Sequence, residues 1–367
     1  MAVKRENRNK GRSNGTYRQE NLFLYAVKFI AAMAVIIIHT RFPGKAGEVI
    51  DAIARFAVPF FFALSGRFLF KSGEKTTPEI RKSMVKSLKK LLTATGIVYL
   101  AYTLFSLIYH LTIFRVDVKT WFFSKYNPVE ALWFLLFNSG RFVYDGSFTF
   151  DHMWFLFALI YVYGLIYIFA PVLRKWYKAL IAVLLFFLYF GEALQTYYPI
   201  RPFGLNICTW YVMRNWLFVG MPFVLLGILF ADSFEEKRNR LKDEEYDRYM
   251  QKYKLPSIIC IVVGMVLSAA EYQIFGKKDV FIGSLLIVIG IFILAETLNT
   301  GFGGLWKFGK TISGNIYYYH VMIIAILDVF VSLPMWLKPL LVMALSILLF
   351  GIFNPKLRKI IRTGSEK

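Results

Sequence analysis

The sequence predicts an all-α fold, a polytopic membrane helical bundle with about ten transmembrane helices and both termini cytoplasmic. Hydrophobic residues fill 57% of the 367 positions and aromatic residues 18%, which leaves too little polar surface for a soluble globule. Apolar stretches of about 20 residues, long enough to span a hydrocarbon core of about 30 Å, recur along the chain. Lys and Arg gather in alternate connections between these stretches, as is typical of cytoplasmic loops.

Each predicted span is an apolar stretch bounded by polar or basic residues. The spans are 22–41, 52–71, 90–111, 152–173, 179–195, 215–232, 255–274, 279–297, 312–332 and 335–353. The region 112–151 contains the apolar segment VEALWFLLF, which is too short to span, and we interpret it as an interfacial or re-entrant helix. An even number of spans places both termini on one side, and the basic residues assign that side to the cytoplasm.

The chain divides into one membrane domain and two basic tails. Residues 1–20 have the polar, basic composition of a disordered cytoplasmic tail, residues 21–354 form the transmembrane domain, and residues 355–367 form a second basic tail. The insertion 233–254 places Glu and Arg at i,i+4 spacing and predicts a solvated cytoplasmic helix. No small-residue cleavage site follows the first apolar run, so we interpret that run as an uncleaved anchor.

Composition also narrows the possible partners. The net charge of +21 is spread over loops between spans, so topology and anionic lipid headgroups explain it better than nucleic acid does. The two cysteines, Cys208 and Cys260, have no neighbours suited to binding a metal ion, and the sequence predicts neither a disulfide framework nor a metal site. The chain has no P-loop and no dinucleotide-binding fingerprint, so a nucleotide-driven pump is not indicated.

Lys28 and His39 lie eleven residues apart in the first apolar run. Eleven helical steps make three turns plus about 20°, which places both side chains on one face, roughly 16 Å apart along the axis. Ionisable groups inside a membrane helix are costly and indicate function. The structural alternative is that Lys28 extends to the inner surface while His39 caps the outer end.

The second predicted span contains two more cations. Arg55 lies near the outer surface, at the depth of His39, and Arg67 lies near the inner surface, at the depth of Lys28. Two clusters result. The inner cluster consists of Lys28, Arg67, Lys86, Lys89 and Lys90, and the outer cluster of His39, Arg55, Asp151 and His152. Glu296 and Asp328 are intramembrane acids that either pair with these cations or relay protons.

Four segments, in order along the chain, carry a resemblance to a known family. They are KFIAAMAVIIIHT, ARFAVPFFFALSGRFLF, DHMWFLFALIY at 151–161 and ISGNIYYYHVMII at 312–324. Together they resemble the acyltransferase family 3 membrane proteins, which show a basic residue and a His in the first span, a VPxFFxxSG stretch in the second, and an aromatic LWFL segment. The sequence departs from that pattern at Lys28, where Arg is commoner, and at Lys86, Lys89 and Lys90, which replace an Arg-x-x-Arg element.

The resemblance implies a multi-pass enzyme of the bacterial cytoplasmic membrane that moves an acyl group, usually acetyl, from cytoplasmic acetyl-CoA to a hydroxyl of a cell-envelope carbohydrate or related molecule. Acyl-CoA is then the donor substrate, and no permanently bound cofactor is expected. The inner cluster faces the compartment that contains CoA and is suited to holding its phosphates. Lys supplies a point charge without the bidentate fork of Arg, so this role is less secure for the lysines.

His39 is the candidate base for acyl transfer, because a sugar hydroxyl needs a group that accepts its proton near neutral pH. A covalent acyl-imidazole on His39 is equally compatible with the sequence. Arg55 is placed to stabilise charge on the thioester oxygen, and His152 to assist proton transfer. Additional candidates are Asp151, Trp154 and His320. The structural alternatives are an interfacial anchor for His152 and a core histidine satisfied by Asn315 or Tyr319 for His320.

A bundle with buried cations also describes a secondary transporter of a small molecule such as an amino acid, or a carrier of acyl groups across the membrane. No repeated half of the kind many transporters show is present, so the sequence favours the acyltransferase.

Overall fold

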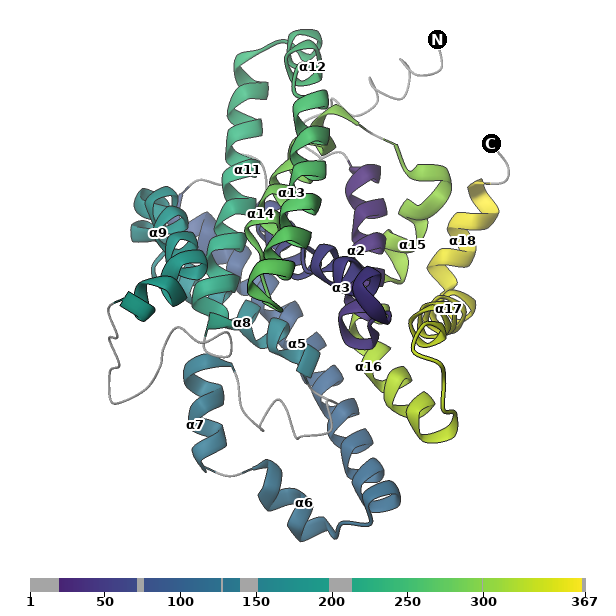
Figure 1. Ribbon diagram of the computed structural model, residues 1–367. Coiled ribbons are helices and arrows are strands. Elements are labelled where there is room, and N and C mark those ends of the chain that lie inside the picture. The colour runs from purple at the N-terminus through teal and green to yellow at the C-terminus, as the bar shows by residue number, and fades with distance from the viewer. Residues whose placement is uncertain are drawn as a thin grey trace.

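The computed structural model describes residues 20–70, 76–126, 128–138, 151–197, 213–298 and 300–364. Within these ranges the ordered elements are all helices and no strand occurs, which confirms the predicted fold class. Figure 1 shows the bundle with α12 (Asp243–Gln251) at one end and α6 (Val118–Lys125) at the opposite end. The predicted topology places the first of these helices in the cytoplasm and the second outside.

Among the described residues the first helix is α2 (Leu22–Thr40), and most of its residues are buried inside the bundle. Its N-terminus is capped by the Asn21 side chain, which accepts a hydrogen bond of 2.8 Å from the backbone N–H of Leu24. It packs against α15 (Leu305–Thr311) and α16 (Ser313–Phe330). Gly309 allows the closest of these approaches, because a Cβ there would overlap the carbonyl oxygen of Tyr25.

The second predicted span consists of α3 (Gly44–Ala54) and α4 (Ala57–Arg67). The last turns of α4 pack directly on α11 (Met221–Arg240) through two glycines. A Cβ on Gly66 would overlap the carbonyl of Val224, and one on Gly227 would overlap the carbonyl of Ala63. This reciprocal contact between small residues fixes the position of Arg67, which directly follows Gly66.

A second close pair is formed by α13 (Lys254–Phe275) and α14 (Ile282–Thr297). Gly264 and Gly283 face each other across it, and neither has room for a Cβ. The buried Glu271 side chain accepts hydrogen bonds of 3.0 Å from the backbone N–H groups of Ile282 and Gly283, so it caps the first turn of α14.

The remaining helices connect and cover these pairs. They are α5 (Thr77–Tyr109), η1 (His110–Phe114), α7 (Pro128–Phe137), η2 (Asp151–Met153), α8 (Trp154–Ile168), α9 (Ala170–Tyr197), η4 (Trp216–Gly220), η5 (Phe302–Gly304), α17 (Leu337–Ile352) and α18 (Pro355–Gly364).

A helix or part of a helix occupies each of the ten predicted spans. By length and apolarity, five helical segments of the described residues can cross a membrane, and up to seven if each sharply bent pair counts as one span. One such pair is α8 with α9, bent by 119°, and α17, with 16 residues, is an apolar helix too short to be counted as a span by itself. The chain is therefore a polytopic membrane protein, and its count of ten spans stays a prediction.

The structure refines the predicted cytoplasmic segments. The insertion 233–254 is not one helix, because α11 continues through Arg240 and α12 starts anew at Asp243. The predicted tail 355–367 contains α18, which packs against α15 and α17. In the region 112–151 the structure places η1, α6 and α7, and residues 139–150 lie outside the described ranges.

Candidate functional site

Three of the four histidines in the chain converge from separate elements. His39 comes from the last turn of α2, His152 from η2, and His320 from the middle of α16. The ring of His320 lies between the other two, with centroid distances of 5.1 Å to His39 and 5.2 Å to His152. The sequence predicted His39 and His152 in one cluster, and the structure adds His320 to it.

His320 is fully buried, and its tautomer is fixed by the backbone. Its Nδ1 lies 2.8 Å from the carbonyl oxygen of Tyr317 and 3.1 Å from that of Ile316. Because a carbonyl only accepts, Nδ1 carries the hydrogen, and in the neutral ring Nε2 carries the lone pair. Nε2 has no hydrogen-bond partner among the described residues. The backbone, rather than Asn315 or Tyr319, thus satisfies one nitrogen and leaves the other available.

His39 differs from His320 in its access to solvent. The residue is half-buried, and neither ring nitrogen forms a hydrogen bond with another described residue. The pair therefore consists of a half-buried histidine next to a fully buried one with a fixed tautomer. Such a pair can accept a proton from a hydroxyl that approaches His39.

His152 joins the start of α8 to α16 through two hydrogen bonds. Its Nε2 donates to the carbonyl of Tyr318 at 2.9 Å, and the Tyr317 hydroxyl donates to the His152 carbonyl at 2.6 Å. The Tyr102 ring packs on the His152 ring at 4.8 Å, and its hydroxyl accepts from the backbone N–H of Met322. This geometry favours a positioning role for His152.

Two arginines near His39, Arg55 of the outer cluster and Arg214, differ in their partners. The buried guanidinium of Arg55 pairs with Asp279 at 2.8 Å and with Asp51 at 3.2 Å, so two carboxylates already balance its charge. Arg214, which precedes η4, lies over the ring of Trp154 at 5.5 Å. Both arginines are close enough to His39 to interact with it electrostatically. The geometry makes Arg55 a clamp between α3 and the α13–α14 connection.

The predicted inner cluster is divided in the structure. Arg67 pairs with the buried Glu296, whose second oxygen accepts from Arg238 at 2.9 Å and from the Tyr246 hydroxyl at 2.7 Å. The guanidinium of Arg67 also lies over the Phe234 ring. Burial and the adjacent carboxylate of Glu296 raise the pKa of Tyr246, which keeps its hydroxyl protonated as a donor. We call these residues, without Phe234, the Glu296 network.

The lysines of the inner cluster make fewer contacts. Lys28 is half-buried and forms no ion pair or hydrogen bond within the described part of the chain. Lys86, Lys89 and Lys90 are exposed on α5, which starts at Thr77 and continues into the third predicted span. Of the two intramembrane acids, Glu296 pairs with a cation of the predicted cluster, whereas Asp328 pairs with Lys338 at 2.7 Å.

Two further candidate residues are Trp154 and Asp151. Trp154 is buried against Phe62 and Arg214, which favours packing. The backbone of Asp151 belongs to η2, and its side chain lies outside what the structure describes. Among the described residues, no group of three or more His, Cys, Asp or Glu side chains is arranged to hold a metal ion.

Sequence reasoning missed Arg214 and Tyr102 near the histidines. Arg214 resembles an ordinary loop cation, since it stands just before a predicted span. Tyr102 carried a usable signal, because a hydroxyl in the middle of an apolar span needs a partner. Arg238 and Tyr246 were also missed, since their helical spacing indicated only a solvated surface.

Comparison with known proteins identifies the family to which the chain belongs. No curated protein and no solved structure matches the chain. The model of the acyltransferase 3 family, described as an acyltransferase domain, matches residues 21–354. That range contains the three histidines, the Arg55 clamp and the Glu296 network. The match covers most of the chain, so this membrane protein is an acyltransferase that belongs to the acyltransferase 3 family.

Proposed function

We propose that the enzyme transfers an acetyl group from cytoplasmic acetyl-CoA to a hydroxyl of a cell-envelope carbohydrate, within the bacterial cytoplasmic membrane. The observation that carries the site assignment is the pairing of a half-buried His39 with a fully buried His320 at the end of α2 that is predicted to face outward. A hydroxyl acceptor outside the cell reaches that end of the bundle without crossing it.

In the proposed step His39 accepts the proton of the acceptor hydroxyl as its oxygen attacks the thioester carbon. A C–O bond forms, the C–S bond breaks, and CoA leaves as a thiolate that then takes up a proton. His320, with its lone pair on Nε2, supports the imidazolium that forms on His39. We propose that Arg214, which lies over Trp154 near His39, stabilises charge on the thioester oxygen, and that Arg55 holds α3 to the α13–α14 connection through its two carboxylate partners.

The donor side of the proposal rests on the cations predicted to face the cytoplasm. Lys28 has no anionic partner among the described residues, and Lys86, Lys89 and Lys90 are exposed on α5. These four lysines are available to CoA phosphates. Arg67 can join them only by exchanging the Glu296 carboxylate for phosphate, so its contribution to donor affinity is expected to be smaller.

The test uses purified enzyme in liposomes, acetyl-CoA labelled in the acetyl group, and envelope carbohydrate as acceptor. The proposal predicts free CoA together with label on carbohydrate that mild base releases, as expected of an oxygen ester. A covalent acyl-imidazole would be favoured over base catalysis if the protein itself becomes labelled in the absence of acceptor and the label is transferred to the carbohydrate when acceptor is added.

Two outcomes would contradict the proposal. One is the absence of any labelled carbohydrate together with intact acetyl-CoA. The other is counterflow of a labelled amino acid in liposomes that contain no CoA, which would indicate a transporter.

A further inference from the structure

One turn of α16 is held at both ends by side chains of other elements. The carbonyl oxygen of Tyr318 accepts a hydrogen bond of 2.9 Å from Nε2 of His152 in η2. The backbone N–H of Met322 donates to the hydroxyl of Tyr102 in α5 at 3.2 Å. In a regular α-helix a backbone N–H donates to the carbonyl four residues earlier, so the helix alone would pair these two backbone groups. Here each of them bonds to a side chain that is distant in the sequence.

Tyr102 is fully buried between α16 and η2. Its ring centroid lies 4.8 Å from that of His152 and 6.5 Å from that of Tyr319, and the two tyrosine rings are nearly parallel, at 7°. A buried hydroxyl needs a hydrogen-bond partner, but an N–H in the middle of a helix normally has one within the helix. The bond from Met322 to Tyr102 therefore adds a constraint on α16 beyond what its own backbone requires.

His320 lies at the middle of the turn between Tyr318 and Met322. Its Nδ1 bonds to the carbonyls of Ile316 and Tyr317, so the ring is attached to the α16 backbone and moves with it. The His39 ring, on a different helix, lies 5.1 Å away. A misplacement of about 1 Å between catalytic groups can cost about 10²-fold in rate, so the setting of this turn matters for any step that uses both rings.

We propose that Tyr102 is a positioning residue for acyl transfer. Its hydroxyl holds the Met322 end of the turn while His152 holds the Tyr318 end, and together they fix the His320 ring at its distance from His39. This inference rests on the proposed function, because it assigns Tyr102 a part in the same proton-transfer step.

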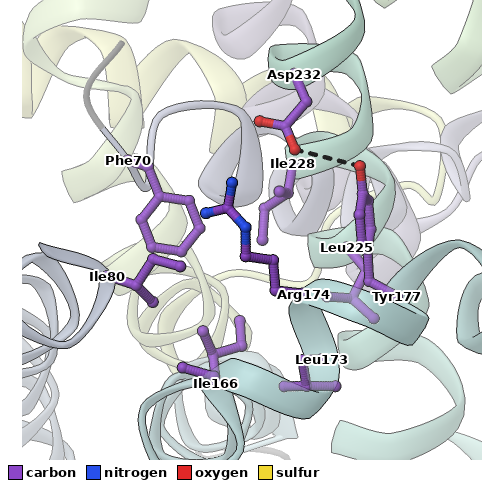
Figure 2. A pocket seen from close by; sticks show the side chains of 10 residues that line it. Phe70, Ile80, Ile166, Leu173, Arg174, Tyr177, Leu225, Ile228 and Asp232 are labelled. Atoms are coloured by element: carbon purple, nitrogen blue, oxygen red, sulfur yellow. Dashed lines mark hydrogen bonds between the residues drawn. The ribbon is translucent and has the colours of Figure 1, made fainter. Parts of the chain in front are cut away.

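A second tyrosine provides a matched control. Figure 2 shows the hydroxyl of Tyr177, on α9, donating to Asp232 on α11, at 3.2 Å. His152 stands just before the start of α8, which is about 22 Å long, and Tyr177 follows its other end. Tyr177→Phe therefore removes a hydrogen-bonded hydroxyl far from the histidines.

The experiment combines acetyl-transfer kinetics with hydrogen–deuterium exchange, both on purified full-length enzyme. Tyr102→Phe keeps the ring and removes only the hydroxyl. We expect kcat to fall about tenfold with the KM for acetyl-CoA unchanged. We also expect amide exchange in the segment that contains Met322 to become about tenfold faster. Tyr177→Phe should leave all three quantities at the wild-type values.

The outcomes separate this inference from the proposed function. Transfer by wild-type enzyme with an unchanged kcat in Tyr102→Phe would overturn the positioning role alone, as would an equal loss in Tyr177→Phe. Absence of transfer by wild-type enzyme would contradict the proposed function, and the positioning role with it. If Tyr102→Phe does not elute as a single species, His152→Gln and His152→Leu decide, because only Gln keeps a donor for the Tyr318 carbonyl. Equal activity of those two variants would overturn the proposal.

Discussion

His320 is held through Nδ1, and that contact determines what its other nitrogen can do. Hydrogen bonds to two backbone carbonyls fix the ring, so in the neutral form Nε2 presents a lone pair inside the bundle. The Nε2 atom has no partner among the described residues, although a buried polar atom without a hydrogen bond costs free energy. Such a cost is commonly retained for function, which is why we place His320 in the proton-transfer step.

We predict that His320→Asn lowers kcat by about 10²-fold or more, because it removes the Nε2 lone pair that supports the imidazolium formed on His39. Donor KM should change little. Acetyl transfer to envelope carbohydrate measures the effect, and His110→Asn is the matched control. His110 is the one histidine outside the cluster and bonds to the Ser106 carbonyl in its own helical turn. Equal losses in the two variants would contradict a specific role for His320.

Glu296 provides a second prediction at the residue scale. Its buried carboxylate balances Arg67 and Arg238 and accepts from Tyr246, so Glu296→Gln leaves two guanidiniums without a counter-charge. Removing one partner of a buried ion pair costs about 3 to 5 kcal/mol. Thermal stability in detergent should fall clearly.

The matched control for that prediction is Glu236→Gln. Glu236 pairs with Arg240 in an exposed i,i+4 arrangement, and exposed pairs contribute about 0 to 1 kcal/mol. A decrease in Tm as small for Glu296→Gln as for Glu236→Gln would show that the Glu296 network does not hold α11 and α12 against α14.

At the scale of elements, glycine contacts fix how the helices approach one another. Gly66 and Gly227 bring α4 and α11 into backbone contact, and that contact sets the depth of Arg67. The sequence allowed part of this to be predicted, since Ser65-Gly66 next to Arg67 is typical of close helix packing. The identity of the partner helix was not predictable, because each span contains small residues and pairing depends on the whole bundle.

We predict that Gly66→Ala destabilises the protein by about 1 to 3 kcal/mol, because the added methyl group overlaps the Val224 carbonyl. Gly96→Ala, in α5, is the control. Its Cβ would meet open space, so stability should be unchanged or should rise by up to about 1 kcal/mol. Thermal unfolding in detergent measures both. Similar melting temperatures for the two variants would contradict the packing of α4 on α11.

The ends of the helices and the angles between them cannot all be predicted from the local hydropathy pattern. The apolar stretch 90–111 was predicted from hydropathy, but α5 starts at Thr77 because a capping box of Thr76 and Glu79 initiates the helix in the polar segment. Likewise 152–173 and 179–195 were predicted as two spans, and the α8–α9 bend of 119° follows Ile168. Hydropathy reports burial in lipid and contains no information on bend angles.

At the scale of the whole molecule, the fold class and the family followed from composition and from four segments in order. The convergence of His39, His152 and His320 was predictable only in part, since depth in the membrane can be read from topology and lateral position cannot. The division of the inner cluster by Glu296 was unexpected for the same reason. A carboxylate 229 positions from Arg67 becomes its partner only through tertiary packing.

The predicted orientation can be tested with single cysteines in a chain that carries Cys208→Ser and Cys260→Ser. Lys45→Cys, on exposed α3, should react with a membrane-impermeant maleimide in intact cells. Arg240→Cys, at the exposed end of α11 that is predicted to be cytoplasmic, should react only after the membrane is opened. The reverse pattern would place His39 on the cytoplasmic side and remove the proposed division between donor and acceptor faces.

The central claim is that acyl transfer takes place at His39, and one measurement tests it most directly. Wild-type enzyme and His39→Ala, both monodisperse and in equal amount in liposomes, receive labelled acetyl-CoA and envelope carbohydrate, and base-labile label on the carbohydrate is followed over time. We expect transfer by wild-type enzyme and a loss of at least about 10²-fold in His39→Ala, with acetyl-CoA binding retained. Transfer at the wild-type rate by His39→Ala would contradict the account.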